Sequence, residues 1–320
     1  MSLSMLGGFS RQLIGQLGGR GVFTPGGVLN YPGSRTLYVR SGGVLSGDPK
    51  EFAEGALFRS IRAALKHCRA GAGDQVIALP GHVENISGAD HWSDLQAGTQ
   101  IVGWGEGELR PILRWTAAGA SLLLNRAGVS VKNFTAQFAG DPLVPVTLTV
   151  TLPITVSAPG VVLSFPEANL GIGANQKVTR AILATDAAKR LSIIHGRWWG
   201  ATAAECTTVI DLAGADNVRI EDMVIEAATS SASVGVMRLV ATALVGGFIS
   251  DCLFANRKAA SSEAVTGVAG SSGQCRNSQF AVLNNTGLTG WSTKANWQFH
   301  NCVVSHDIAE NAGLMTVVSA

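Results

Sequence analysis

The stretch NVRIEDMVIEA, residues 217–227, decides the fold of this chain. Apolar and polar residues alternate on both sides of Asp222, which predicts two short strands joined by a kink at that residue. The stretch NWQFHNCVVSH, residues 296–306, has the same pattern, with Asn301 at the kink. The two stretches share few identical letters, so the property that repeats is side-chain direction rather than sequence identity.

Eight segments of the chain share this pattern. In each, an apolar residue stands two positions before the kink, and these residues are Ile101, Val131, Leu163, Ile194, Ile220, Ile249, Cys275 and Phe299. The kink residues are then Gly103, Asn133, Phe165, Gly196, Asp222, Asp251, Asn277 and Asn301. All of them except Phe165 are Gly, Asn or Asp, which tolerate a left-handed backbone at low steric cost.

Neighbouring repeats lie between 24 and 32 residues apart, as their residue numbers show. A period of this length, with short β-rich segments and a sharp turn at a fixed position, is typical of a solenoid in which like residues stack. A leucine-rich repeat would need a Leu-rich consensus, and a propeller blade would need about 40 residues. We therefore predict an all-β fold, a parallel β-helix.

A helix is expected at the front of this coil. Apolar residues from Phe52 to Cys68 recur near helical spacing, which predicts a helix over about residues 50–69 that stops near Gly71. The stretch GDQVIALPGHVENIS follows and predicts a strand that ends at Pro80. A helix in this place would cover the open first turn, whose unpaired backbone groups would otherwise invite edge-to-edge association.

A helix followed by GDQVIALPGHVENI resembles the start of pectin-lyase-like β-helix proteins, particularly those of tailed-bacteriophage virions. The resemblance covers roughly Arg40 to the C-terminus and implies a right-handed parallel β-helix domain over residues 40–320. It indicates the fold more than the function, because the superfamily includes polysaccharide lyases, glycosidases, phage tailspikes and non-enzymatic virion proteins.

Residues 1–39 differ in composition from the rest of the chain. They contain paired glycines, spaced arginines and apolar residues, and no acidic residue. Such a segment is expected to be either an extended arm that orders against a partner or a disordered tail. For a docking arm, the anchoring apolar side chains and orienting arginines would be Phe9, Arg11, Leu13, Ile14, Arg20, Phe23 and Tyr31.

Composition restricts the expected partners. Charged residues make up 14% of the chain and the net charge is +2, which gives no reason to expect nucleic acid. No apolar run approaches the roughly 20 residues of a membrane span, and the start lacks the pattern of a signal peptide. Five widely spaced cysteines fit neither a disulfide framework nor a zinc pattern, so we expect buried thiols in a protein made in a reducing cytoplasm: Cys68, Cys206, Cys252, Cys275 and Cys302.

Hydrolases and lyases with a β-helix fold use carboxylates on adjacent turns. The candidate acidic cluster is Asp211, Asp216, Glu221, Asp222, Glu226 and Asp251. Asp222 and Asp251 occupy kink positions where Asn or Gly serves equally well, so we interpret them as structural. The histidines are scattered, and no Glu or Asp completes a metal-ligand set around His300 and His306, which are close in sequence. We therefore expect no catalytic residue, no cofactor and no metal site.

The segment IIHGRWWG supplies a candidate carbohydrate patch formed by His195, Arg197, Trp198 and Trp199. Aromatic side chains with an arginine can bind sugars. Adjacent residues of a strand point to opposite faces, however, so at least one of the two tryptophans is expected to pack inside.

The segment DPLVPVTLTVTLPITVSAPGVV, residues 141–162, is almost free of charge and rich in β-branched residues. It lies between two predicted turns and is longer than a connection requires. Exposed apolar strands invite aggregation, so we expect this insertion to be covered by another subunit or packed along the flank of the coil.

These features favour a non-enzymatic structural protein of a bacteriophage virion, most directly a capsid decoration or cement protein. It would form a homotrimer, be made in the host cytoplasm, and attach through its arm to the major capsid protein or another virion protein. The alternative is a tail component or tailspike-type β-helix that binds or cleaves host surface polysaccharide. A secreted polysaccharide lyase is a third hypothesis, which the expected lack of an export signal disfavours.

Overall fold

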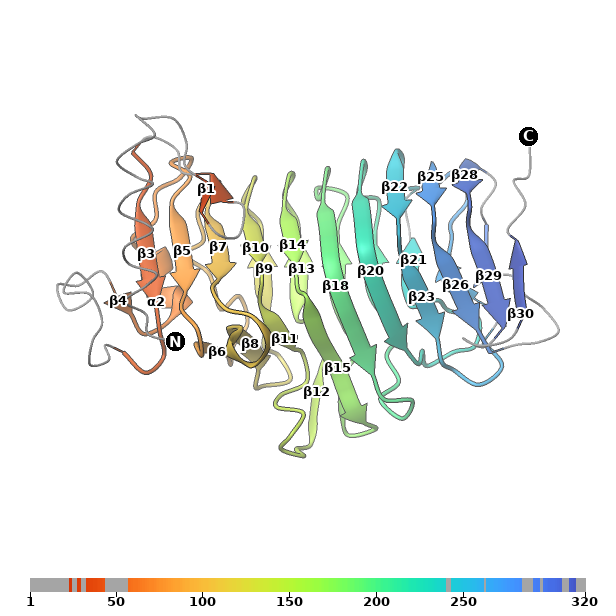
Figure 1. Ribbon diagram of the computed structural model, residues 1–320, viewed down its shortest axis with the longest axis horizontal. Coiled ribbons are helices and arrows are strands. Elements are labelled where there is room, and N and C mark those ends of the chain that lie inside the picture. The colour runs from red at the N-terminus through yellow and green to blue at the C-terminus, as the bar shows by residue number, and fades with distance from the viewer. Residues whose placement is uncertain are drawn as a thin grey trace.

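The computed structural model describes residues 23–24, 28–29, 33–43, 57–239, 243–261, 263–283, 290–293, 296–306 and 311–314. Short parallel strands stack side by side along one long axis, and the chain advances along that axis turn by turn (Figure 1). The protein is a parallel β-helix of about 8 turns, which confirms the predicted all-β fold class.

Each complete turn contributes strands to three rows. The first row contains β3 (Thr36–Val39), β5 (Gln75–Ala78), β7 (Gln100–Gly103), β10 (Ser130–Lys132), β14 (Val162–Ser164), the starts of β18 (Ser192–Gly200) and β20 (Arg219–Ala227), β22 (Gly247–Ser250), β25 (Ser272–Arg276) and β28 (Asn296–His300). The second row contains β6 (Val83–Ile86), β8 (Ile112–Trp115), β11 (Thr135–Gln137), β15 (Glu167–Gly173), the ends of β18 and β20, β23 (Leu253–Asn256), β26 (Gln279–Val282) and β29 (Val303–His306). The third row contains β9 (Leu122–Leu124), β13 (Ile154–Val156), β17 (Arg180–Ala184), β19 (Thr208–Leu212), β21 (Met237–Leu239), β24 (Glu263–Thr266) and β27 (Gly290–Trp291).

The predicted column of apolar residues runs through the interior of the first row. Strand register stacks Ile101 on Val131, Val131 on Leu163, and so on along the coil as far as Cys275 and Phe299. These residues belong to one continuous buried core. The agreement follows from the two-residue period of a strand, because a one-residue slip would turn every apolar side chain outward.

One position of that column was predicted wrongly. Ile193, not Ile194, stacks on Leu163 and Ile220. The kink consequently falls on His195, whose φ is 54°, and not on Gly196. A Cβ added at Gly196 would lie 2.6 Å from Trp198 Nε1, so this glycine provides space inside the coil rather than a turn.

The other kink residues follow the prediction except at two positions. A positive φ is found at Asn133, Asp222, Asp251, Asn277 and Asn301. Neither Gly103 nor Phe165 has a positive φ, so neither is a left-handed corner. A Cβ at Gly103 would collide with the backbone oxygen of Asn133, and Phe165 is a buried core residue.

The helix expected over residues 50–69 lies partly outside the described residues, which omit 44–56. Within the described part, α2 (Ile61–Leu65) begins after Ser60, whose side chain accepts a hydrogen bond from Ala63 N. The helix contacts β3 and β5 and buries Ile61 and Leu65. Its role as a cover for the first turn stays a prediction.

The N-terminal end of the coil contains residues that were expected to belong to the arm. Strand β3 pairs in parallel with β5 on one side and with β4 (Leu57–Phe58) on the other, so the coil already includes Thr36–Val39. Before it, β1 (Phe23–Thr24) pairs antiparallel with β2 (Val28–Leu29). The proposed anchors outside the described residues are Phe9, Arg11, Leu13, Ile14, Arg20 and Tyr31.

Three further strands extend the rows. β12 (Leu148–Val150) pairs with β16 (Gln176–Val178), and β16 also pairs antiparallel with β15, beside the main body of the coil (Figure 1). At the C-terminal end, β30 (Asn311–Leu314) pairs antiparallel with β29. An antiparallel strand interrupts the stacking direction of the second row at this end.

Candidate functional site

The candidate carbohydrate patch lies on β18, where alternate side chains point outward. His195, Arg197 and Trp199 are exposed, whereas Trp198 is buried. The indole Nε1 of Trp198 donates a hydrogen bond of 3.0 Å to the backbone oxygen of Phe165. Trp198 is therefore a core residue and cannot contact a ligand on the surface, which leaves three residues of the four in the patch.

His195 forms a hydrogen bond with Asp222, the residue at the same position of the next turn. Its Nδ1 lies 2.8 Å from Asp222 Oδ2, and both side chains are more than half exposed. Exposed pairs of this kind add little stability, because water competes for both partners and salt screens the attraction. The pair therefore positions the imidazole ring more than it stabilises the fold.

The contacts continue along the same edge of the coil, in a row that we call the corner ladder: His195, Asp222, Asp251, Asn277 and Asn301. Asn277 Nδ2 donates to Asp251 Oδ1 at 3.2 Å, and Asn301 Nδ2 donates to Asn277 Oδ1 at 3.1 Å. The register of β20 on β22 brings Asp222 beside Asp251. Stacking in one row was the expected arrangement, and the mutual hydrogen bonds support the structural interpretation of both aspartates.

A shallow groove of about 210 Å³ opens beside the ends of β23 and β26. Its lining residues are Thr202, Ala255, Asn256, Arg257, Ala281, Val282 and Leu283. Ala255 is the register partner of Glu226, which is in turn the register partner of Trp199. The exposed indole and the groove thus lie on the same side of the coil, with β20 between them, and Glu226 is ion-paired with Arg257.

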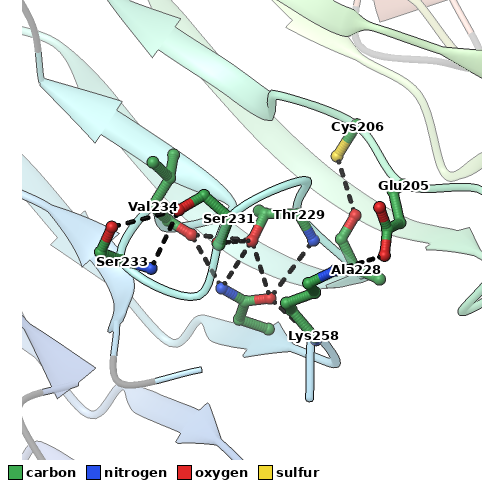
Figure 2. Close-up of polar contacts among 9 residues, drawn as sticks. Glu205, Cys206, Ala228, Thr229, Ser231, Ser233, Val234 and Lys258 are labelled. Atoms are coloured by element: carbon green, nitrogen blue, oxygen red, sulfur yellow. Dashed lines mark hydrogen bonds and ion pairs between the residues drawn. The ribbon is translucent and has the colours of Figure 1, made fainter. Parts of the chain in front are cut away.

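The buried amide of Asn256 lines this groove, and Figure 2 shows the residues that its contacts join, among them Thr229, Val234 and Lys258. Asn256 Nδ2 donates to Thr229 Oγ1 at 3.0 Å and to the backbone oxygen of Val234 at 2.8 Å. Its Oδ1 accepts from the backbone N–H of Lys258 at 3.1 Å, and Lys258 Nζ reaches Glu205 Oε1 at 2.6 Å. Because both amide atoms of Asn256 are bonded within the protein, this residue shapes the groove and has little capacity left for a ligand.

The candidate acidic cluster does not converge on one site. Asp211 lies on β19 in the third row, Glu226 on β20 in the second row, and Asp222 at the corner between rows. Their partners are Arg180 and Arg238 for Asp211, Lys189 for Asp216, Arg219 for Glu221, His195 for Asp222, Arg257 for Glu226, and Asn277 for Asp251. Carboxylates that are separated and individually paired favour the structural interpretation over a role as an acid pair.

Sequence reasoning missed a buried carboxylate at the start of the coil. Glu84 is 2% exposed and lies 3.1 Å from His82 Nε2 and 3.5 Å from His91 Nε2. It also accepts the backbone N–H groups of Ile61 and Arg62 at the start of α2. Burial alone would raise the pKa of Glu84, but these hydrogen bonds outweigh it and lower the pKa to about 2.

The sequence carried part of this signal. His82 and Glu84 are two residues apart next to a predicted strand, so they share a face. The contribution of α2 depends on tertiary contact across more than twenty residues and has no local pattern. We interpret the cluster as structural, because it ties α2 to β6.

The predicted insertion over residues 141–162 divides into two parts. Ile154 and Val156 of β13 are buried in the core, so the second part belongs to a regular turn. Residues 141–147, which we call the flank loop, project from the coil, and Leu143, Val144 and Val146 are 88%, 55% and 42% exposed. Cover by another subunit stays a prediction.

Both ends of the flank loop are held in place. Asp141 Oδ2 lies 2.8 Å from Arg114 Nη2. Gln176 Nε2 donates to the backbone oxygen of Asp141 at 2.9 Å, and its Oε1 accepts from Val146 N at 3.1 Å. The exposure of the apolar side chains is therefore set by specific contacts at the base of the loop.

Neither a metal-binding cluster nor a membrane-spanning helix is found among the described residues. No group of three or more His, Cys, Asp or Glu side chains in this part of the chain is placed to hold a metal ion. No helix within it is long and apolar enough to cross a membrane. A comparison of the chain with family models, curated proteins and solved structures finds no significant match.

Proposed function

We propose that the protein is a non-enzymatic structural protein of a tailed-bacteriophage virion, most directly a capsid decoration or cement protein. The observation that carries this proposal is the flank loop. Its side chains Leu143, Val144 and Val146 are exposed while hydrogen bonds and an ion pair fix its base. Apolar groups held outward in this way are expected to be buried against another protein molecule.

The architecture of the coil suits such a role. Most strands pair with one neighbour on each side, so the body is a rod whose turns support one another. A rod offers long flanks for lateral contacts. The resemblance of the sequence to virion β-helix proteins is the reason for proposing a virion. The exposed flank loop is the reason for expecting an assembly.

The proposed partners follow from the two surfaces. The flank loop would contact other copies in a homotrimer, and residues 1–39 would attach the trimer to the major capsid protein or another virion protein. After synthesis in the host cytoplasm the protein would reside in the virion. No cofactor takes part.

The test is direct detection in particles. Particles are purified by density gradient from a phage-producing culture of the source organism and probed with an antibody against this chain. We expect the chain to sediment with the particles at a fixed ratio to the major capsid protein. Recovery of the chain only in the soluble fraction of the lysate would overturn the proposal.

The attachment role of the arm needs a truncation that spares the coil. Deletion of residues 1–31 retains β3, whereas deletion of 1–39 would remove a strand of the first row. Particles that lack the protein are incubated with the full chain or with the truncated chain. We expect the truncated chain to fold and to lose attachment, and unchanged occupancy would assign attachment to the flank.

A tail component or tailspike-type protein that binds host surface polysaccharide is the second candidate. The exposed side chain of Trp199, with Arg197 on the same strand face and the groove beside it, favours this alternative. Binding of purified host polysaccharide should weaken at least tenfold in Trp199→Ala. The control Leu109→Ala removes another exposed apolar side chain and should leave binding unchanged. Shortening of the polysaccharide chains would indicate cleavage.

A further inference from the structure

Two cysteines of consecutive turns meet inside the coil near its C-terminal end. Cys275 Sγ and Cys302 Sγ lie 3.4 Å apart, and both residues are buried. The other three thiols contact backbone carbonyl oxygens, as Cys302 also does at His300: Cys68 contacts that of Ala64, Cys206 that of Ala228, and Cys252 those of Ser250 and Ile220. Cys275 and Cys302 thus differ from the other cysteines in having a sulfur as a neighbour.

The corner geometry explains why these two side chains converge. Cys275 occupies the inward column of the first row, where its register partners are Ile249 and Phe299. Cys302 directly follows Asn301, whose φ of 53° bends the chain between β28 and β29. The inward side chain before one corner and the inward side chain after the next corner therefore reach the same part of the interior.

We propose that Cys275 and Cys302 form a site of reversible oxidation, at which a peroxide converts the thiol pair into a disulfide between two consecutive turns. The proposal is independent of the proposed function. A disulfide bond is about 2.05 Å long, so closing the gap of 3.4 Å requires each sulfur to move by about 0.7 Å. Small rotations of the two side chains supply a movement of this size.

The reaction needs only hydrogen peroxide as oxidant. One thiolate attacks the peroxide, the O–O bond breaks, and a sulfenic acid forms with release of hydroxide, which takes up the thiol proton to give water. The second thiol attacks the sulfenyl sulfur, the S–O bond breaks, and a second water leaves as the S–S bond forms. Two thiols and one peroxide thus give one disulfide and two waters, and a dithiol reductant restores both thiols with two electrons and two protons.

The contact between the sulfurs makes this pair selective. The contact between the two sulfurs lowers the pKa of the Cys302 thiol, because a thiolate at Cys302 is stabilised by a hydrogen bond from the Cys275 thiol, and the thiolate is the form that attacks peroxide. The resulting sulfenic acid meets its resolving thiol without a change of fold. A sulfenic acid at Cys206 would find a carbonyl oxygen instead of a thiol.

The test uses the full chain, incubated with hydrogen peroxide, unfolded, alkylated and weighed by intact mass spectrometry. The reduced chain should take up five alkyl groups, one for each cysteine, and the oxidised chain three. Digestion without reductant should yield a peptide that links Cys275 to Cys302. Because the bond closes a segment of 27 residues, the unfolding temperature should rise by roughly 5 °C and fall again after reduction.

Serine variants separate this site from general oxidation. After peroxide, neither Cys302→Ser nor Cys275→Ser should yield a linked peptide or show a rise in unfolding temperature, because the remaining thiol of the pair can go no further than a sulfenic acid, one oxygen heavier and without an alkyl group. Cys252→Ser removes a buried thiol from the neighbouring turn and should still form the linked peptide. Uptake of five groups by the peroxide-treated wild-type chain, or a disulfide that survives in Cys302→Ser, would overturn the proposal.

Discussion

The buried carboxylate of Glu84 links α2 to β6. It accepts the backbone N–H groups of Ile61 and Arg62 and contacts His82 and His91. A charge in such a place is tolerated only because donors surround it. The same donors make the stability of this region dependent on pH.

Replacing Glu84 by Gln should expose that dependence. The folded pKa of about 2 lies below the ordinary value of 4.5, so the stabilising contribution is complete above pH 4.5 and is lost as the pH falls toward 2. A difference of this size corresponds to about 3 kcal/mol. The free energies of unfolding of the two proteins, measured from pH 6 to pH 2, should differ by that amount at pH 6 and converge in acid. A difference independent of pH would show that the charge of Glu84 is not responsible.

Gly196 should be intolerant of even one added methyl group. An alanine Cβ would lie 2.6 Å from Trp198 Nε1 and 2.7 Å from the backbone oxygen of Phe165, the two groups joined by a buried hydrogen bond. We expect Gly196→Ala to lower the free energy of unfolding by about 1 to 3 kcal/mol. Gly119→Ala is the matched control, since nothing lies within 4 Å of a Cβ there. Equal unfolding midpoints in urea for both variants would contradict this explanation.

The same glycine shows what the sequence could and could not reveal at the scale of residues. Glycine serves either to adopt a positive φ or to leave space, and both uses look alike in a sequence. The column pattern was read correctly at Val131, Ile220 and Cys275, where an apolar residue has one plausible direction. It failed at Ile193 and Ile194, because two adjacent isoleucines fit an inward column equally well.

At the scale of elements, the corner ladder determines how one row of strands passes into the next. Asn277 has a φ of 46° and takes part in hydrogen bonds with Asp251 and Asn301. Asn277 therefore both adopts the left-handed backbone conformation of the corner and hydrogen-bonds with its neighbours in the ladder. Asparagine combines both properties, whereas glycine supplies only the first.

Two substitutions at Asn277 separate these contributions. Asn277→Ala loses the hydrogen bonds and places a Cβ in the left-handed region, so the free energy of unfolding should fall by about 2 kcal/mol. Asn277→Gly restores the backbone freedom, so its free energy of unfolding should decrease by about half as much as that of the alanine variant. Both are measured by urea unfolding. An alanine variant as stable as the glycine variant would mean that the corner is not strained.

Which strands would form beyond the three rows was not predictable. β12 and β16 come from consecutive turns and pair beside the coil, and their contact depends on how far the flank loop projects. The alternation of Thr and apolar residues in β12 is common to many strands, so it does not indicate which strand β12 pairs with. Likewise, the groove is lined by residues near the ends of β23 and β26 together with Thr202, and no single segment of the sequence encodes it.

At the scale of the whole molecule, the flank loop should control association. The double substitution of Leu143 and Val144 by Asp places charge on the apolar surface and should prevent trimer formation. Static light scattering should give about three times the monomer mass of 33.1 kDa for the wild-type chain and the monomer mass for the variant. Leu109→Asp, on another exposed site, should remain a trimer. A monomeric wild-type chain at micromolar concentration would contradict this prediction.

The parallel stacking of the turns also has a consequence for how the chain reaches its fold. Each turn pairs with the turn made just before it, so long-range contacts along the coil span about one repeat at any length. A growing chain on the ribosome could add turns in the order of synthesis, each using the previous turn as a template. Among the described turns, the turn around β3 and β5 is the first in the chain, so its loop-closure entropy is not offset by the edge of an earlier described turn. Nucleation of the first turn should therefore be slow, and the addition of each later turn should be fast.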